Sequence, residues 1–397
     1  MKRILAGTIG IILLFVAANI SYGLDYTYMD YSSNGTAPYG ISSDGSMTVG
    51  YYTDSDGQAR GYLLKGTTFV PLPYYPGALW DMAYGVNNAG TIVGVYYGED
   101  QLVHGYSLAG TTYTPIDYPG ASTTWAYGIN NAGTIVGFYI DASGTHGFSL
   151  NGTAWAPLDY PGATSTRAHG INDGGTIVGY YKDISGTSHG FSFDGNAWSN
   201  LDYPGAPDTR AHGINNPGVI AGAWYEGAVA HGFSLNGTAW TALDYQDADS
   251  TWGSGIDHAG TILGRYMRSN EIHGFLATPG AMSVEIDIRP WTSNNIISYR
   301  DWGLLPVAIL SNIDFDALEM MNLKTITLGH EGDENSMAFC SPWEWDVNRD
   351  GYQDLICLFW IRKAAFRCGD TEGILRGITQ GGVAVEGRNP VKIIPCK

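Results

Sequence analysis

Hydrophobic and polar residues alternate over short stretches in the first two thirds of the chain, and turn-type sequences separate these stretches. One unit, residues 127–163, reads YGINNAGTIVGFYIDASGTHGFSLNGTAWAPLDYPGA. Its segments YGI, TIVGFY, HGFSL and WAPLDYPG are rich in β-branched and aromatic residues. NNAG and NGT are turn sequences, because Asn and Gly tolerate a positive φ. The unit shows no helical spacing and therefore predicts four short strands.

The same unit occurs six times. The glycine of its G-I or G-V pair falls at Gly40, Gly85, Gly128, Gly170, Gly213 and Gly255, at intervals of 45, 43, 42, 43 and 42 residues. Four strands in about 43 residues is the size of one blade of a β-propeller. We therefore expect an all-β chain in which residues 24–282 form a six-bladed β-propeller.

The two ends of the repeat array complement each other. The last copy stops at HGFLATPG, residues 273–280, without a following LDYPGA segment. A segment of that type, YMDYSSNGTA at residues 28–37, instead precedes the first G-I pair. This offset predicts a closed ring in which the first and last parts of the array share strands. An open solenoid would more naturally carry polar capping repeats, and closure also hides edge strands.

The repeat also resembles a known family. The segments GINNAGTIVG, HGF and LDYPGA, found between about residues 28 and 280, resemble the HAF family of extracellular repeats of bacteria. This resemblance implies an extracellular location and no defined activity.

The N-terminus has the features of a signal peptide. Lys2 and Arg3 precede an apolar run at residues 9–18, and the small residues Ser21 and Gly23 suit cleavage after Gly23. The alternative is a membrane anchor, but the run is shorter than the roughly 20 residues that a spanning helix needs. We expect residues 1–23 to be removed. The mature protein would then be secreted or held at the cell surface, with the periplasm as a further location, and would have no membrane span.

The charge balance excludes one class of partner. The chain has 20 Lys+Arg against 38 Asp+Glu, a net charge of −18. Nucleic-acid binding needs a basic face, so this composition argues against it.

Two polar residues recur with the repeat. The histidine of HGF stands at His104, His146, His189, His231 and His273, with Arg60 in the first copy, and the aspartate of LDY stands at Asp30, Asp117, Asp159, Asp202 and Asp244. Equivalent residues of different blades are too far apart to share one metal ion at bond lengths of about 2 Å. We expect the histidines to be structural, for example bonding a neighbouring strand's backbone, and the aspartates to bond in turns or across strands.

Other repeat positions vary, and these are the candidates for ligand binding. The residues three places before the repeated glycine are Ala37, Met82, Trp125, Arg167, Arg210 and Trp252; those just before it are Tyr39, Tyr84, Tyr127, His169, His212 and Ser254. Aromatic faces suit sugars and Arg suits carboxylates. We predict a rim site made of Trp125, Arg167, Arg210, Trp252, Tyr84, Tyr127, His169 and His212. The alternative is ordinary packing between blades.

A second domain is expected at residues 283–397, where the repeat is absent. SVEIDIRP, LLPVAILS, KTITLG, LICLFW and GGVAVEG read as strands separated by turns, which favours a small β-sandwich. All four cysteines lie here: Cys340, Cys357, Cys368 and Cys396. In an exported protein they predict two disulfides, for which three pairings exist.

The segment DVNRDGYQDL, residues 346–355, carries a calcium-type pattern. Its oxygen-bearing residues are Asp346, Asn348, Asp350, Tyr352 (through its carbonyl) and Asp354, with Gly351 at the turn. Alternate oxygen ligands around a sharp turn suit Ca²⁺. Position 12 is Cys357 instead of a bidentate Glu, so a weak site is expected. The alternative is a plain acidic turn.

The C-terminal segment also resembles a module of secreted bacterial proteins. VEIDIRP, LLPVAIL, the loop at 346–355 and CGDTEGILRG carry this resemblance, and the loop is similar to the shortened calcium loops of dockerin-type proteins. The resemblance implies that Cys340 pairs with Cys368, which leaves Cys357 with Cys396. It implies an accessory role and no reaction.

These features together favour a non-catalytic binding or surface-structure protein, with an extracellular carbohydrate or protein as ligand and calcium as cofactor. A calcium-dependent adhesin is a variant of this hypothesis. The alternative is an enzyme acting on extracellular polysaccharide, a glycosidase or lyase, since propellers host such activities. The sequence contains no nucleophile motif, zinc signature or phosphate loop.

Overall fold

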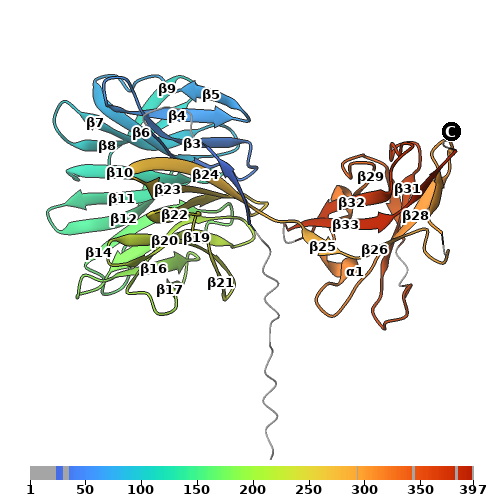
Figure 1. Cartoon of the computed structure of the whole chain (residues 1–397). Coiled ribbons are helices and arrows are strands. Elements are labelled where there is room, and N and C mark those ends of the chain that lie inside the picture. The colour runs from blue at the N-terminus through green and yellow to red at the C-terminus, as the bar shows by residue number, and fades with distance from the viewer. Residues whose placement is uncertain (1–23, 30–34, 293, 342–344, 381–382, 396–397) are drawn as a thin grey trace, which may run out of the picture.

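The structure of the protein is a computed structural model that describes residues 24–29, 35–292, 294–341, 345–380 and 383–395. The signal peptide predicted for residues 1–23 therefore lies outside the described residues. Figure 1 shows two lobes, one built by the repeats and one by the C-terminal segment, joined by a short stretch before β25 (Met282–Val284).

The N-terminal lobe is made of strands alone among the residues described. They form six four-stranded sheets in chain order, and two of these sheets are linked by one parallel pair, Thr145 with Ser165. The first two sheets are β2 (Thr36–Ile41), β3 (Met47–Thr53), β4 (Ala59–Lys65), β5 (Thr68–Pro71), and β6 (Ala78–Val86), β7 (Ile92–Gly98), β8 (Val103–Ala109), β9 (Thr112–Ile116). The next two are β10 (Thr123–Ile129), β11 (Ile135–Asp141), β12 (Gly144–Asn151), β13 (Ala154–Leu158), and β14 (Ser165–Ile171), β15 (Ile177–Lys182), β16 (Ser188–Phe193), β17 (Trp198–Leu201). The last two are β18 (Asp208–Ile214), β19 (Ile220–Glu226), β20 (Val229–Asn236), β21 (Ala239–Ala242), and β22 (Ser250–Ile256), β23 (Ile262–Arg268), β24 (Glu271–Pro279) with β1 (Leu24–Tyr28).

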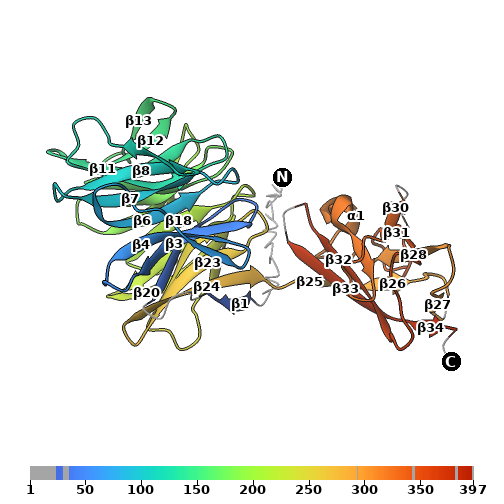
Figure 2. The ribbon, with the colours of Figure 1, turned by 90° about the horizontal axis from the view of Figure 1, so that it is seen from above.

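The sixth sheet joins the two ends of the array. β1 pairs antiparallel with β24, with Leu24 opposite Pro279 and Tyr28 opposite Phe275. The N-terminal part of the array thus completes the last sheet, but the pairing strand lies before the segment expected for this role, residues 28–37, and shares only Tyr28 with it. The first strands of neighbouring sheets, β2, β6, β10, β14, β18 and β22, contact one another in a closed series, because β22 returns to β2. Figure 2 shows the sheets of this lobe from above.

The repeated glycine permits this close arrangement around the axis. A Cβ added to Gly128 would lie 2.6 Å from the carbonyl oxygen of His169, and one on Gly170 would lie 2.7 Å from that of His212. Real Cβ atoms do not approach oxygen so closely. Five of the six first strands therefore need glycine where the next sheet's backbone passes, and at Gly255 the nearest backbone atom is 3.3 Å away.

Small hydrophobic clusters fill the space between neighbouring sheets. The aromatic residue of each HGF-type motif is fully buried: Tyr62, Tyr106, Phe148, Phe191, Phe233 and Phe275. Phe148, for example, packs with Val93, Ile116 and Ala126. Val93 and Ile116 belong to the preceding sheet, so each cluster ties one sheet to the next. The alternating pattern of the sequence thus becomes a chain of inter-sheet cores.

The C-terminal lobe has two four-stranded sheets that share one hydrophobic core. One sheet orders β25, β33 (Ala384–Pro390), β32 (Glu372–Ile378) and β29 (Thr327–Gly329); the other orders β26 (Ile286–Ile288), β28 (Leu304–Ile309), β31 (Leu355–Trp360) and β30 (Met337–Cys340). A short pair, β27 (Ile296–Ser298) with β34 (Lys392–Ile394), and two single turns, α1 (Ala317–Met320) and η1 (Leu323–Thr325), complete it. None of the helices described is long and apolar enough to cross a membrane.

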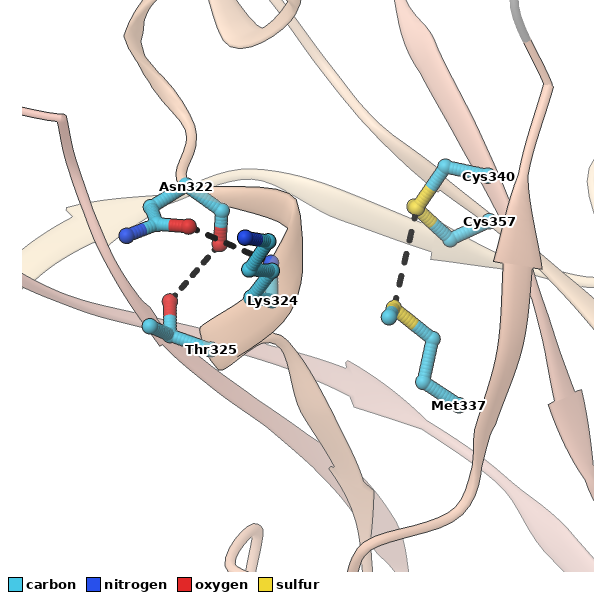
Figure 3. The surroundings of a disulfide bond; sticks show 6 residues. All are labelled: Asn322, Lys324, Thr325, Met337, Cys340 and Cys357. Atoms are coloured by element: carbon cyan, nitrogen blue, oxygen red, sulfur yellow. Dashed lines mark hydrogen bonds between the residues drawn. A yellow bond between two sulfur atoms is a disulfide. The ribbon is translucent and has the colours of Figure 1, made fainter.

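One disulfide differs from the expected pairing. Cys340 is bonded to Cys357, 17 residues later, with Met337 beside the bridge (Figure 3). The predictions that Cys340 pairs with Cys368 and Cys357 with Cys396 are both wrong, because Cys340 and Cys357 stand directly opposite each other in the antiparallel pair β30 and β31. Cys368 is also disulfide-bonded. Cys396 lies outside the described residues.

Candidate ligand-binding site

Each first strand of the repeat array contains a β-bulge at the same place. In β10 the register shifts between Ala126 and Gly128, which leaves Tyr127 without an opposing residue. Bulges re-aim a side chain and occur often beside functional sites. The equivalent bulged residues of the six sheets are Tyr39, Tyr84, Tyr127, His169, His212 and Ser254. These are the residues just before the repeated glycine, one of the two variable sets identified in the sequence.

All six bulged residues line one pocket at the axis of the ring. The cavity holds about 190 Å³ and is completed by Tyr180, Arg210, Tyr225 and Arg265. Below it, the six glycines and their neighbours surround a smaller space on the axis, with a volume of about 70 Å³. The pocket therefore lies at one end of the axis, and at least one residue from each sheet contributes to its wall.

Five of the six bulged residues carry rings, and these rings form a continuous arc. Ring centroids lie 4.7 Å apart for Tyr39 and Tyr84, 4.5 Å for Tyr84 and Tyr127, and 4.2 Å for Tyr127 and His169. His169 stacks on His212 at 5.5 Å. Such distances are typical of favourable aromatic pairs. The arc ends at Ser254, where the sixth position has no ring.

The gap in the arc is occupied by an arginine. Nη1 of Arg265 donates to Oγ of Ser254 at 2.8 Å, and the guanidinium carbon lies 4.5 Å from the centre of the Tyr39 ring. Arg210 differs, because its Nε and Nη2 both donate to the carboxylate of Asp208, at 3.0 and 2.9 Å. The pocket lining thus contains one arginine matched by a carboxylate and one that meets a hydroxyl and aromatic faces.

The two histidines of the arc are neutral. Burial, with the positive charge of Arg265 next in importance, lowers the pKa of His212 to about 3. Burial and the nearby His212 hold the pKa of His169 well below its ordinary value. Nδ1 of His212 lies 2.8 Å from the carbonyl oxygen of Gly253, so this nitrogen carries the proton and Nε2 has the lone pair. The positive charge of the pocket therefore comes from arginine.

The predicted rim residues fall into two layers. Tyr84, Tyr127, His169, His212 and Arg210 line the pocket. The other three, Trp125, Arg167 and Trp252, stand behind the lining. Trp125 stacks on Tyr127, Arg167 Nη1 donates to the Tyr180 hydroxyl at 3.1 Å, and Trp252 Nε1 donates to the Tyr225 hydroxyl at 3.1 Å. The structure thus brings the whole predicted set to one end of the axis, and its role in binding stays a prediction.

Sequence reasoning missed Tyr180, Tyr225 and Arg265. Two of them, Tyr180 and Arg265, stand at a position that varies between repeats. This position directly follows the glycine in the second strand of each sheet, and its residues are Tyr51, Val95, Phe138, Tyr180, Ala223 and Arg265. In the β-ladder this residue lies opposite the one three places before the repeated glycine. For example, Trp252 is opposite Arg265 and Arg167 is opposite Tyr180. Its variation between repeats marks it as part of the same surface. Tyr225 stands two residues further along its strand, at a position that also varies between repeats.

The repeated histidines and aspartates lie away from this pocket and bond to each other. Nδ1 of His146 is 3.1 Å from the carboxylate of Asp159, and the equivalent pairs are His104–Asp117, His189–Asp202 and His231–Asp244. The aspartates thus make the cross-strand bonds expected of them. The partner of these histidines is a carboxylate and not the backbone suggested as an example. His273 lies 3.4 Å from the Tyr28 hydroxyl, and Asp30 is outside the described residues.

The opposite end of the axis carries a belt of polar residues. Nδ2 of Asn130 donates to the carbonyl of Asn172 in the next sheet, while its Oδ1 accepts from the backbone N–H of Thr134. The same inter-sheet bond links Asn87 to Asn130, Asn172 to Asn215 and Asn215 to Asp257. These side chains are buried. The belt, which we call the asparagine belt, ties neighbouring sheets together and leaves a cavity of only about 50 Å³.

The calcium-type loop is folded around its own backbone. The carboxylate of Asp346 accepts from the N–H groups of Asp350 and Gly351, both at 3.1 Å. Asp354 is fully buried, and its two oxygens accept from Ser311 and Val347. Over the described part of the chain, no group of three or more His, Cys, Asp or Glu side chains is placed to hold a metal ion. Calcium binding by Asp346, Asn348, Asp350, Tyr352 and Asp354 stays a prediction.

Comparison with known proteins gave structural matches only. No family model and no curated protein matches the chain. Among solved structures, it is similar to the lectin of Aleuria aurantia, described as a six-bladed β-propeller with fucose recognition (TM-score 0.37, 14% identity, 62% of this chain and 96% of that chain). It is also similar to TolB from Acinetobacter baumannii (TM-score 0.41, 10% identity, 62% of this chain and 54% of that chain). A third match is the β-propeller domain of the Trilobed protease from Pyrococcus furiosus (TM-score 0.41, 11% identity, 62% of this chain and 79% of that chain). These identities say nothing of the ligand of this chain.

Proposed function

We propose that this protein is an exported, non-catalytic binding protein that holds a carbohydrate ring in its axial pocket. In this proposal the six sheets are the blades of a six-bladed β-propeller, and the C-terminal lobe is an accessory β-sandwich. Six consecutive four-stranded sheets and the pairing of β1 with β24 support the propeller. Two sheets over one core support the sandwich. Export rests on the features of residues 1–23, and the HAF resemblance agrees with it.

The observation that carries the proposal is the arc of aromatic rings around the pocket. Sugars present an apolar face of C–H groups and an edge of hydroxyls, and aromatic side chains with polar neighbours suit both. Tyr39, Tyr84 and Tyr127 contribute aromatic rings to the lining, and Ser254 and Arg265 contribute polar atoms. At about 190 Å³ the pocket is smaller than the roughly 300–1,000 Å³ typical of drug-sized ligands, so it suits a single sugar ring.

A binding role fits this lining better than glycoside hydrolysis. Glycosidases use two carboxyl groups roughly 5–9.5 Å apart across the scissile bond. The described residues that line the pocket include no Asp or Glu, and the nearby Asp208 is engaged by Arg210. A protein ligand would have to reach the recess with a single side chain.

The test is sugar binding by the chain from Leu24 onward, measured on a glycan array and then by calorimetry. Tyr127→Ala removes the central ring of the arc and is expected to weaken binding about two- to twelvefold, the equivalent of an aromatic contact of about 0.5–1.5 kcal/mol. Tyr74→Ala is the matched control, because Tyr74 is 60% exposed and outside the lining. Absence of sugar binding by the unaltered chain would refute the proposal.

One observation favours an enzyme as the second candidate. His212 is neutral and presents an unprotonated Nε2, the form that a general base needs. Such a base would serve a lyase, which removes a proton and forms an unsaturated sugar. A pKa of about 3 makes it a weak base. Ultraviolet detection of unsaturated product on incubation with acidic polysaccharides would establish the lyase, and binding without product supports the non-catalytic role.

For the C-terminal lobe we propose stabilisation by calcium at the loop of residues 346–354. Asp346 and Asp350 are exposed or half-buried and supply side-chain oxygens close to Gly351. Millimolar Ca²⁺ is expected to raise the melting temperature of the unaltered chain, and Asp350→Asn should reduce that rise. Asp314→Asn, an exposed aspartate outside the loop, serves as control. An equal response of all three chains would refute calcium binding at this loop.

A further inference from the structure

The charge of the axial pocket is opposite to that of the protein as a whole. The chain carries a net charge of −18, yet Arg210 and Arg265 both line the pocket and no acidic residue described does so. Arg210 is neutralised by its fork to Asp208. Among the lining residues, the positive charge of Arg265 is therefore not balanced by a carboxylate.

Arg265 is held in place without being neutralised. Its guanidinium donates to Ser254 and lies between the rings of Tyr39 and Trp252, at 4.5 and 5.1 Å from their centres. In the described part of the chain it has no carboxylate within ion-pair distance. Two aromatic faces and one hydroxyl fix the plane of the guanidinium but leave most of its five N–H donors unused.

The effect of this charge reaches across the pocket. Arg265 contributes, after burial, to the low pKa of His212, and it also lowers the pKa of His169. Both imidazoles are thus neutral, so they cannot compete with Arg265 for an anion by carrying charge. Among the residues that line the pocket, Arg265 offers an anion a positive charge that no carboxylate balances, in the gap that Ser254 leaves in the aromatic arc.

We infer that the pocket selects an acidic sugar, a pyranose bearing a carboxylate, whose ring lies on the aromatic arc and whose carboxylate pairs with Arg265. This inference rests on the proposed carbohydrate-binding function and names the class of sugar. Arginine recognises carboxylates through two parallel N–H donors. A ring face beside a planar cation matches a uronic acid, in which the carboxylate replaces the hydroxymethyl group of the neutral hexose.

The experiment compares matched pairs of ligands by calorimetry: the methyl glycosides of glucuronic, galacturonic and mannuronic acids, each against its neutral parent hexose, and benzoate as a carboxylate on a ring that is not a sugar. At least one uronate is expected to bind tenfold or more tightly than its neutral parent, because a hydrogen bond to a charged group contributes about 1.5–3 kcal/mol. Benzoate is expected to bind more weakly than that uronate.

Two variants locate the carboxylate. Arg265→Gln removes the charge and should reduce the affinity for the uronate to that of the neutral sugar, while Arg265→Lys keeps the charge and should retain part of the preference. Arg268→Gln is the control, because Arg268 lies on the same strand β23, outside the pocket lining, and binds the carbonyl of Asp247. Thermal unfolding of each variant separates lost binding from lost folding.

The outcomes separate the two proposals. Equal affinity for uronates and neutral hexoses refutes the acidic-sugar inference and leaves the carbohydrate-binding function standing. Unchanged uronate preference in a folded Arg265→Gln chain also refutes the inference. Tighter binding of benzoate than of every uronate shows a carboxylate site that is not a sugar site, and no binding of any sugar removes both proposals.

Discussion

The two ends of the ring axis are built from neighbouring residues of the same strands, yet they differ in kind. At one end stand the bulged residues, which change from Tyr to His to Ser between sheets. At the other end, two residues beyond the repeated glycine, stands the asparagine belt, with Asn87, Asn130, Asn172 and Asn215 in nearly every sheet. The uniform end makes the same side-chain bond between sheets four times, whereas the side chains of the variable end differ, and His212 there bonds the carbonyl of Gly253.

The glycine between the two ends explains why they are separate. It brings each first strand against the next sheet, so a space of only about 70 Å³ lies on the axis between the pocket and the belt. Substitutions at the constriction, at the belt and at the outer edge of a sheet should therefore have different and decreasing effects.

The largest effect is expected for Gly128→Ala at the constriction. The new Cβ would meet the carbonyl oxygen of His169 at 2.6 Å, so the inner strands must separate. Overpacking of this kind costs about 1–3 kcal/mol of the free energy of unfolding, and sugar binding should weaken because Tyr127 and His169 shift with their strands. Urea unfolding followed by tryptophan fluorescence measures the loss.

Gly174→Ala is the control for this variant. Gly174 is exposed, stands where three other repeats have alanine, and its added Cβ would be 3.3 Å from the nearest atom. We expect a change within about 0.5 kcal/mol. Equal destabilisation by both variants would contradict the role of the constriction.

A smaller effect, confined to stability, is expected for Asn130→Ala at the belt. This change leaves the half-buried N–H of Thr134 and the buried carbonyl of Asn172 without their bonds to Asn130, at a cost of about 1–2 kcal/mol. Sugar affinity should stay unchanged, because the pocket lies beyond the constriction. Calorimetric titration together with urea unfolding checks both.

The exposed Asn151→Ala, at the β12–β13 turn, is the matched control and should leave both quantities unchanged. A loss of sugar affinity in Asn130→Ala would show that the two ends of the axis are coupled.

The smallest effect is expected at the outer edge, for His104→Asn. Burial opposes protonation of this histidine, but bonds to Asp100 and Asp117 outweigh it and raise its pKa. The protonated pair therefore adds stability below the unfolded value of about 6.5, and this contribution is lost as the pH rises through the higher folded pKa. His104→Asn should cost about 0.2–1 kcal/mol near pH 5.5 and less near pH 9, measured by urea unfolding at both pH values.

Asp117→Asn should reduce the same pH dependence, since it removes one of the two charges that face His104. A cost of His104→Asn that does not change with pH would show that the pair acts by packing against Tyr96 alone.

The sequence by itself determined the features of this protein that depend on local chemistry repeated six times. Period-two alternation and turn residues define the strands, the glycine interval defines the sheets, and the missing last segment indicates that β1 joins β24. Eight rim residues could be chosen because they vary where the rest of the repeat does not. The strands and the sheets follow from spacing along the chain and agree with the structure, whereas the role of the eight rim residues in binding stays a prediction.

Only the tertiary structure decided which distant residues meet. The bulge that turns Tyr127 toward the axis, the entry of Arg265 beside Ser254 and the pairing of Cys340 with Cys357 all depend on register between strands. A shift of one residue reverses the face on which a side chain lies, and no single repeat reveals that register. The charge of the pocket was hidden for the same reason, since it arises where the last sheet meets the first.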